Sequence, residues 1–482
     1  MNYRSILSIL GFLVGCSGTA MLLGIPFSIY YGDNDVIPIL LSSGISTVIG
    51  FGSWRVFKQQ KQELGIREGF LIATAGWIAI ALFGTLPYLL SGSITSFTDA
   101  FFETISGFTT TGASVLVDVE KLPHGVLFWR SMTHWIGGMG IIVLSLAILP
   151  LLGVAGMQLY KAEAAGPTKD KLSPRIAETA RLLWGVYVLL TTAEVVLLLF
   201  GGMSVFDALC HSFGTIATGG FSTKNASVAY YKSPFIDYVI GTFMFLSAVN
   251  FSLHYAAVRG DVLNYFKNSE FKFFVLLVGS AIAFVAVVNG LTLPEQNFLD
   301  VFRFSFFNVI SISSCTGFAN ADFALWAFAS QFVLFVLMFP GGCAGSTSGA
   351  IKNVRIFLLL RNILTETKRI IHPKAVIPIK FNGRVVEPEI LSVIASFFVL
   401  YISTFAISSL LLMITGVDLV SAISGVASCM GGVGPGLNAV GPMSNYFAFS
   451  DLAKWVLSAD MLLGRLELFT VMVIFTKSFW KV

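Results

Sequence analysis

Charged residues are scarce in this sequence. Lys, Arg, Asp and Glu make up 12% of its 482 residues, whereas soluble domains carry roughly 25%. Six long stretches contain none of the four, and they cover residues 5–32, 69–98, 131–160, 323–351, 390–417 and 419–450. With 55% hydrophobic residues and a mean hydropathy of +0.82, this composition excludes soluble enzymes, disordered or collagen-like chains and nucleic-acid-binding proteins.

Cysteine is also sparse and is not grouped. The five cysteines lie far apart and form no Cys-x-x-Cys pair: Cys16, Cys210, Cys315, Cys343 and Cys429. Such spacing argues against a disulfide framework or a zinc site. Each thiol is therefore expected to pack as a small apolar side chain.

Motifs of catalysis and nucleotide binding are missing as well. The five histidines include no His-Glu-x-x-His and no pair at ligand spacing. A Gly-x-Gly-x-x-Gly phosphate loop does not occur, so no organic cofactor is expected on this chain, and nucleotide control would come through a partner. A membrane-embedded enzyme is a remote alternative that only the hydrophobicity supports.

What the sequence does contain is a series of long apolar segments. A helix needs about 20 mostly apolar residues to span a bilayer. Ten crossings are predicted, at residues 5–31, 36–54, 69–92, 128–156, 180–202, 236–258, 272–292, 323–351, 390–416 and 452–478. The first is too long for a cleavable signal peptide, and the second follows almost at once. The chain is therefore expected to be an all-α polytopic membrane protein.

Basic residues indicate which side of the membrane each loop occupies. If the N-terminus is cytoplasmic, most of the 30 basic residues fall in internal segments: residue 4 and the segments 55–67, 161–181, 259–272, 352–384 and 477–481. Because basic residues near spanning segments stay in the cytoplasm, this orientation is self-consistent. Both termini are expected to be cytoplasmic.

Four short segments rich in glycine, threonine and serine resemble one another. They end at Gly112, Gly220, Gly317 and Gly434, and each follows a stretch apolar enough to enter the membrane. Counting back thirteen residues from three of these glycines reaches Asp99, Asp207 and Ser421, residue types favoured as helix N-caps. The third copy fits less well, because Asp300 lies four residues too early. Each unit is predicted to be a spanning helix, a capped half-helix, a glycine-rich turn and a second spanning helix.

Such units restrict the possible functions. Non-helical backbone at membrane depth is tolerated only inside protein or along a watery cavity. Four turns around one axis would form a ring of carbonyl oxygens, the arrangement that replaces the hydration shell of K⁺. Glycine suits these turns because the alternating backbone requires positive φ angles. For any single copy, an ordinary helix-breaking loop is the alternative.

The ordered series of motifs resembles the Trk/Ktr/HKT superfamily of cation transporters, in its bacterial TrkH/TrkG branch. The motifs are TTTGA at 109–113, WIGGMGII at 135–142, GMQLY at 156–160, PRIAET at 174–179, GGFST at 219–223, GGCAGST at 341–347, VGPGL at 433–437 and GRLE at 464–467. The resemblance implies four pseudo-symmetric helix–pore-helix–helix repeats around a central pore, plus two N-terminal spanning helices. The corresponding parts would be an extension at 1–57 and repeats at 67–160, 174–260, 270–370 and 386–482.

The function implied by this resemblance is K⁺ uptake across the bacterial inner membrane. K⁺ is then the transported ion rather than a cofactor. Members of the branch form homodimers in the bilayer and work with a cytoplasmic nucleotide-binding (NAD/ATP) ring, TrkA. The sequence leaves open whether the protein is a channel or an ion-coupled K⁺ or Na⁺ symporter. Secondary transporters typically use inverted repeats, whereas these four repeats share one orientation.

The resemblance also assigns a selectivity filter. It would consist of the backbone carbonyls of each repeated glycine and of the two residues before it: Thr110, Thr111, Gly112, Thr218, Gly219, Gly220, Cys315, Thr316, Gly317, Gly432, Val433 and Gly434. In the plant relatives, serine at the first filter glycine accompanies Na⁺ transport, so glycine in all four copies favours K⁺. The branch usually has asparagine before the fourth turn, where this chain has Gly431 and Gly432.

A gate is implied below the filter. Residues 339–350 interrupt an uncharged run with proline and clustered glycine, which break a membrane helix. The proposed gating residues are Gly341, Gly342, Cys343, Ala344, Gly345, Ser346, Thr347, Ser348 and Gly349 of this loop, with Arg465. A static kink is the alternative for the loop. The branch usually has more glycines after the threonine of this loop.

Arg465 is singled out because an intramembrane charge is a functional hypothesis by default. The resemblance implies that it lies beside the ion path, where its positive charge would oppose cation entry. The alternative is an ion pair with Glu467 or Asp460.

Two charged surfaces complete the expectations. Acidic residues near the external face could concentrate cations, although two of them could equally be helix caps; they are Asp99, Glu103, Asp118, Glu120, Asp207, Glu295 and Asp300. Segment 352–384 is strongly basic, with Glu366 as its single acid. It could dock the cytoplasmic ring or simply reflect its place inside the membrane.

Overall fold

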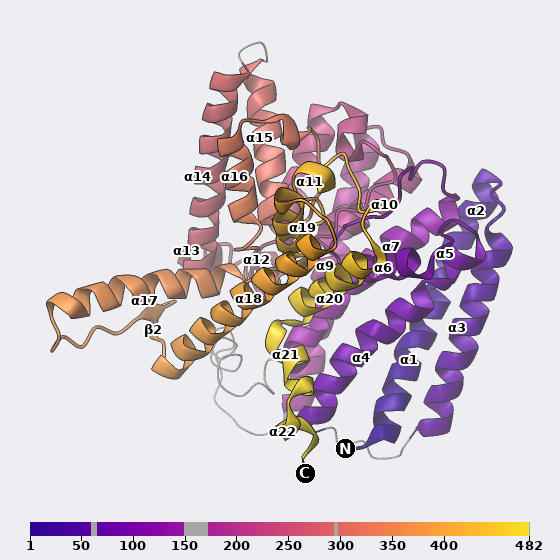
Figure 1. The fold of residues 1–482 in the computed structure, drawn as a ribbon, viewed down its shortest axis with the longest axis horizontal. Coiled ribbons are helices and arrows are strands. Elements are labelled where there is room, and N and C mark those ends of the chain that lie inside the picture. Colours follow the sequence, from indigo (N-terminus) through magenta and orange to yellow (C-terminus); the bar gives the residue numbers. More distant parts are fainter. Residues whose placement is uncertain (59–64, 149–171, 294–296, 482) are drawn as a thin grey trace.

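The computed structural model describes residues 1–58, 65–148, 172–293 and 297–481, and it is almost entirely helical (Figure 1). Within these described ranges, six helical segments are long and apolar enough to cross a membrane: Tyr3–Tyr31, Val36–Phe57, Ile66–Leu90, Thr179–Phe200, Ser269–Thr292 and Pro388–Ile414. A bent pair of helices would make a seventh. The chain is therefore a multi-pass membrane protein.

The N-terminal helices form a pair at one side of the molecule (Figure 1). α1 (Tyr3–Met21) continues through α2 (Ile25–Tyr31), and α3 (Val36–Phe57) returns alongside them. Small residues allow the close approach, since a Cβ on Gly15 would collide with Phe51 and one on Gly50 would collide with the Gly15 backbone. The predicted two-helix extension thus exists as a packed hairpin.

The outer helices of the bundle surround four central ones, which are called the short helices. The outer helices are α4 (Ile66–Gly84), α7 (His124–Ile148), α9 (Leu172–Phe200), α11 (Pro234–Ser247), α14 (Ser269–Thr292), α18 (Pro388–Ile414) and α20 (Asp451–Leu466). The short, central helices are α6 (Phe97–Phe108), α10 (Val205–Ile216), α15 (Phe298–Ser313) and α19 (Leu419–Gly431). Their last turns are buried on every side, which is why polar backbone can end there.

Three of the ten predicted crossings are not continuous helices. Segment 236–258 bends by 104° between α11 and α12 (Phe251–Val258), because Asn250 caps a new helix there. Segment 323–351 contains a short 3-10 helix (Phe323–Leu325) and α16 (Phe328–Leu337) before the chain becomes irregular at Pro340 and its glycines. Segment 452–478 breaks at Glu467, whose φ is +62°. The last part of segment 128–156 and the motif at 156–160 lie outside the described residues.

The predicted N-caps are wrong by three residues. The caps are Ser96, Ser204 and Asp418, and each accepts a hydrogen bond from the backbone N–H three residues later. Asp99 and Asp207 instead occupy the third helical position, where an acid complements the positive helix end.

In the third copy, Asp300 lies four residues too early because the short helix is longer. Asn297 caps α15, which has 16 residues, whereas α6 and α10 have 12 each and α19 has 13. The third short helix is therefore about one turn longer.

Two further features lie outside the packed core of the bundle. The two termini lie near each other (Figure 1), where Arg67 donates to the Lys481 carbonyl (2.7 Å) and Glu68 accepts from the Asn2 N–H (3.1 Å). α17 (Asn353–Ile371) projects away from the bundle, followed by the two-stranded hairpin of β1 (Lys380–Phe381) and β2 (Arg384–Val385). Short helices complete the chain: α5 (Leu86–Leu90), α13 (Asn264–Lys267), α21 (Leu468–Met472) and α22 (Lys477–Trp480).

Candidate functional site

The four repeated turns have the same backbone geometry. Each glycine has positive φ, between 78° and 99°, and so does the residue two positions earlier, between 53° and 70°. These pairs are Thr110 and Gly112, Thr218 and Gly220, Cys315 and Gly317, and Gly432 and Gly434. The repeat inferred from composition is therefore a repeat of conformation.

Each short helix ends in the same hydrogen-bonded cap. In all four turns, the N–H of the residue before the glycine donates to a carbonyl five residues back (Thr111 to Ser106, Gly219 to Gly214, Thr316 to Ser311 and Val433 to Ser428; 2.7–2.9 Å). The preceding N–H donates to the carbonyl three residues back (3.0–3.3 Å), which completes the Schellman pattern. Because the left-handed position of this cap penalises a Cβ, Gly432 adopts it more easily than Thr110, Thr218 or Cys315.

The turns touch one another around a closed ring. A Cβ built on Gly112 would collide with the Gly219 carbonyl, one on Gly220 with that of Thr316, and one on Gly317 with that of Val433. A Cβ on Gly434 would lie 2.7 Å from the Thr111 carbonyl, which returns to the first turn. The four turns thus meet in chain order, and each glycine makes room for a carbonyl of the next turn.

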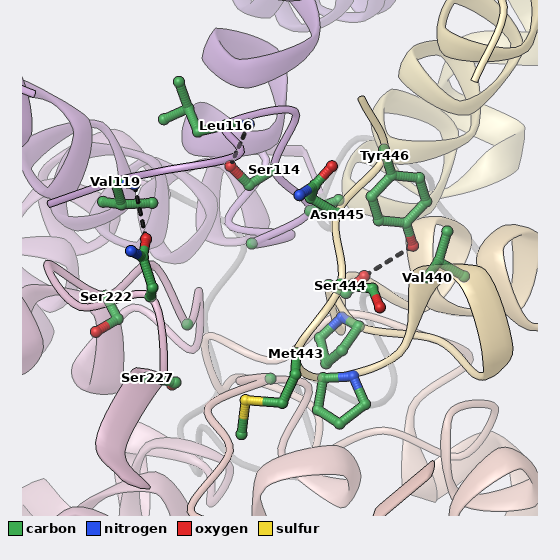
Figure 2. Close-up of a pocket in the computed structure, with 18 of the residues that line it drawn as sticks. Ser114, Leu116, Val119, Ser222, Ser227, Val440, Met443, Ser444, Asn445 and Tyr446 are labelled. Atoms are coloured by element: carbon green, nitrogen blue, oxygen red, sulfur yellow. Dashed lines mark hydrogen bonds between the residues drawn. The ribbon is translucent and has the colours of Figure 1, made fainter. Parts of the chain in front are cut away.

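One pocket of about 150 Å³ opens against all four glycines. Figure 2 shows its walls, with Val119 and Ser222 on one side and Val440 and Tyr446 on the other. The charged side chains that line it are Arg130 and Lys224. The pocket is therefore the entrance to the ring, and its described lining is not acidic.

The acidic residues expected at this entrance have other partners. Asp99 pairs with Lys454 (2.6 Å), Glu103 with Arg130 (2.7 Å), Asp118 with Lys121 (2.9 Å), Asp207 with Lys224 (3.8 Å) and Asp300 with Arg303 (2.9 Å). Glu120 accepts from the Asn225 N–H, and Glu295 lies outside the described residues. The Asn225 amide and the Lys121 ammonium hold the pKa of exposed Asp118 below its usual value. The structure does not support an acidic, cation-concentrating entrance.

The irregular loop 339–350 lies against the ends of three short helices. Ser348 Oγ donates to the Ser314 carbonyl (2.6 Å), and Thr347 Oγ1 lies 3.0 Å from the Ile216 carbonyl. A Cβ on Gly349 would collide with the Gly431 carbonyl. The loop is thus packed on the side of the ring opposite the pocket, at the carbonyl ends of α10, α15 and α19.

The same loop docks on the bend between α11 and α12. Cys343 N–H donates to the Ala248 carbonyl (2.8 Å), and the Gly345 carbonyl accepts from Phe251 N–H (3.0 Å). Thr347 Oγ1 is also 3.1 Å from the Ser247 carbonyl. Breaking a helix frees its last carbonyls, and here the loop is their partner.

Other residues of loop 339–350 bond to α14, to one another and to the start of α17. Ala344 N–H donates to Glu270 on α14 (2.7 Å), and Ser346 Oγ donates to the Cys343 carbonyl (2.6 Å). Gly341 and Gly342 accept hydrogen bonds from the side chain and the N–H of Asn353, at the start of α17. All the residues from 339 to 350 except Gly345 are buried or half-buried.

Arg465 joins this loop to α7. Its guanidinium is buried, with Nη1 2.6 Å from the Thr347 carbonyl and Nη2 3.2 Å from the Gly137 carbonyl. Neither proposed carboxylate partner contacts it: Glu467 pairs with Arg355 (2.7 Å), and Asp460 accepts from Ser408 (2.8 Å). Among the described residues, Arg465 therefore forms no ion pair and is held by carbonyls.

Lys352 belongs to this site, although the sequence placed it in the basic segment facing the cytoplasm. Its Nζ donates to the Ser348 carbonyl, and its φ of +76° is unusual for a residue with a side chain. The signal available in the sequence was its position directly after an uncharged run of 29 residues that ends in glycines (323–351). A second cation thus accompanies Arg465 at the loop.

Comparison with known proteins gives consistent results. Residues 39–481 match the model of the TrkH family, described as a cation transport protein. Over its full length, the chain is 43% identical to the Trk system potassium uptake protein TrkH of Salmonella typhimurium, which is likewise fully covered. It is 35% identical to TrkG of Escherichia coli, with 100% of this chain and 99% of that protein covered. The crystal structure of the potassium transporter TrkH from Vibrio parahaemolyticus superposes with a TM-score of 0.92 at 38% identity, covering both chains fully.

Proposed function

This chain belongs to the TrkH family of cation transport proteins, and on that premise we propose that it takes up K⁺ through the ring formed by its four turns. The observation that supports this most directly is the contact of each filter glycine with a carbonyl of the next turn. Such a ring offers carbonyl oxygens in place of water around a dehydrated ion. The coordinating residues would be 110–112, 218–220, 315–317 and 432–434.

The electrostatics of the short helices support the same function. The carbonyl end of a helix carries roughly half a negative charge, and its effect is confined to the last turn. The four short helices all end at the ring, so four such ends face a cation there. K⁺ is the cargo, and within the described residues no group of three or more His, Cys, Asp or Glu could hold a resident metal ion.

The loop 339–350 is the proposed gate. It is held under the ring by Thr347, Ser348 and Arg465, whose hydrogen bonds are all accepted by backbone carbonyls. Hydrogen bonds of this kind contribute only about 0.5–1.5 kcal/mol each, or about 1.5–3 kcal/mol when one group is charged. A loop held this way can move when a partner favours another position. The charges of Arg465 and Lys352 would oppose cation passage while it stays.

The partners proposed for the family have a natural place on this chain. α17 projects from the bundle (Figure 1), and it carries Arg361, Lys368 and Arg369. A cytoplasmic nucleotide-binding ring would dock on this basic helix, with both termini cytoplasmic and the chain forming a homodimer in the bilayer.

Ion flux in liposomes tests the proposal. Purified protein should carry K⁺ and Rb⁺ in preference to Na⁺ and Li⁺, and the flux should follow the electrical potential without a gradient of H⁺ or Na⁺. Flux that requires such a gradient would instead favour an ion-coupled symporter. The absence of any K⁺ flux from correctly folded protein would contradict both.

A further inference from the structure

Each short helix carries one special position, nine residues before its filter glycine. It holds Glu103, His211, Asn308 and Gly425 in the four copies. The first three side chains are buried and reach the chain just beyond their own filter turn. The four copies thus share a location and differ in chemistry.

Glu103 makes the largest set of contacts. Its carboxylate accepts hydrogen bonds from Ser114 Oγ (2.9 and 3.1 Å) and from Val115 N–H (2.9 Å), directly after the first turn. It also pairs with Arg130 Nε (2.7 Å). Because Arg130 Nη1 donates to the Ser222 carbonyl (3.0 Å), the same pair also holds the chain after the second turn. One buried ion pair therefore ties two neighbouring turns together.

His211 and Asn308 do the same with neutral groups. His211 Nδ1 is 2.8 Å from the Asp207 carbonyl, which can only accept, so this nitrogen carries the proton and Nε2 meets Ser222 Oγ at 2.9 Å. Asn308 Nδ2 donates to Asn320 Oδ1 (2.8 Å), and Asn320 in turn donates to Asp237 (3.0 Å). Each contact again fixes the segment two or three residues beyond the filter glycine.

The fourth copy is braced from outside instead. Gly425 has no side chain, and the ring of Tyr446 lies where one would extend, 3.6 Å from an ideal Cβ. The Tyr446 hydroxyl donates to the Gly434 carbonyl (2.9 Å, dashed in Figure 2), and its N–H donates to the Ser114 carbonyl (2.8 Å). Ser424 Oγ accepts from Leu437 N–H (2.9 Å). This brace takes the place of the side chain that Gly425 lacks.

We propose that Glu103, His211, Asn308 and Tyr446 are positioning residues of the filter, and that ion selectivity depends on Glu103 more than on the others. Hydrogen bonds to charged groups are roughly twice as strong as neutral ones, and Glu103 alone among these four residues combines them with an ion pair that reaches the next turn. Holding the carbonyl ring at a fixed size is what lets it distinguish K⁺ from the smaller Na⁺. The inference rests on the proposed function.

The test is the ratio of K⁺ to Na⁺ flux in Glu103→Gln, measured together with thermal stability. Gln keeps the size of the side chain and removes its charge, so the ratio should fall about tenfold, which corresponds to 1.4 kcal/mol. Asp35→Asn is the matched control, because Asp35 is also buried and accepts a backbone N–H, from Val126 (3.0 Å), outside the filter. Its ratio should equal that of the wild type even if stability falls.

Two further variants keep the test decisive. Arg130→Gln combined with Glu103→Gln should lower the ratio by less than the product of the two single effects, because the pair acts as a unit. Tyr446→Phe removes one hydroxyl, and this variant should fold and lower the K⁺ to Na⁺ flux ratio about threefold. If Glu103→Gln does not fold, Tyr446→Phe is measured in its place. An unchanged flux ratio in folded Glu103→Gln would overturn the inference. If Glu103→Gln does not fold, an unchanged ratio in Tyr446→Phe would overturn it. A wild type without K⁺ preference would refute the proposed function itself.

Discussion

Two kinds of position with positive φ occur in each filter turn, and they differ in what surrounds them. At the last glycine of a turn, a Cβ would collide with the carbonyl of the next turn; at Gly432, the nearest atom would be 3.9 Å away. Threonine or cysteine occupies the position equivalent to Gly432 in the other three copies. Conformation alone therefore does not require glycine in these turns, whereas the contact between turns does.

Gly112→Ala is predicted to reduce the K⁺ to Na⁺ flux ratio strongly, since the added methyl group would push the Gly219 carbonyl out of place. Gly432→Ala is the matched control, because it adds the same group at positive φ with open space around it. That variant should lose only about 1–2 kcal/mol of stability and keep its selectivity. Flux ratios and thermal denaturation of both purified proteins check the prediction, and equal ratios would contradict it.

The contacts of Arg465 also lead to a prediction at the scale of a single residue. Arg465→Gln is predicted to raise K⁺ flux, because it removes a charge that is held at the loop by carbonyls and has no carboxylate partner among the described residues. A unit charge 4 Å from an ion contributes on the order of 4 kcal/mol at intermediate dielectric. Flux and melting temperature are measured on the same sample. Lower stability without a gain in flux would remove Arg465 from the ion path.

At the scale of elements, the bend between α11 and α12 and the loop 339–350 form one unit. The bend exposes the carbonyls of Ser247 and Ala248, and the loop supplies donors for both. The break in the second repeat and the break in the third repeat therefore stabilise each other.

Thr347→Val is predicted to raise K⁺ flux severalfold, because valine keeps the shape of threonine and loses the hydroxyl that bonds to α10 and α11. Removing a hydrogen bond of this kind weakens the closed position by about 1 kcal/mol. Thr404→Val on α18 is the control, since Thr404 Oγ1 donates to the Leu400 carbonyl of its own helix (2.9 Å). Increased flux in both variants, or in neither, would count against the loop as a gate.

At the scale of the whole molecule, α17 is the element that leaves the bundle (Figure 1). Its outer part exposes apolar residues, with Ile370 80% and Ile371 70% exposed, beside basic ones. Such a mixed surface is suited to a protein partner rather than to water alone.

Charge reversal at Arg361, Lys368 and Arg369 is predicted to abolish activation by the nucleotide-binding ring while leaving the basal K⁺ flux unchanged. These residues lie 8 to 16 positions after Asn353, the first residue of the projecting helix, so the reversal leaves the loop and the ring unchanged. Reversal of Arg55 and Lys58, at the end of α3, is the control and should preserve activation. Binding of the ring protein to each variant, and flux with and without nucleotide, provide the measurement.

Local features of the sequence predicted much of this protein correctly. Uncharged stretches identify a membrane protein because a charge in the bilayer is costly wherever it falls. The four turns were found because glycine, threonine and serine recur in the same order. The caps were misplaced because Ser-x-x-Asp contains two residues suited to a helix start, and composition does not tell which of them is the cap.

The rest depended on contacts between distant segments. Hydropathy predicted crossings at 236–258 and 452–478 without locating the breaks in their helices, since a broken helix is as apolar as a straight one. In 323–351, by contrast, proline and clustered glycine did predict the break. Tyr446 entered the site because a residue far away in the chain supplies its partner, the Ser114 carbonyl. Lys352 entered it because the loop folds back and brings the Ser348 carbonyl to its ammonium group. The sequence alone determined that this protein lies in a membrane and repeats a glycine turn four times. Only the tertiary structure decided that the turns close into one ring, because each glycine is required by a carbonyl about a hundred residues or more away in the chain.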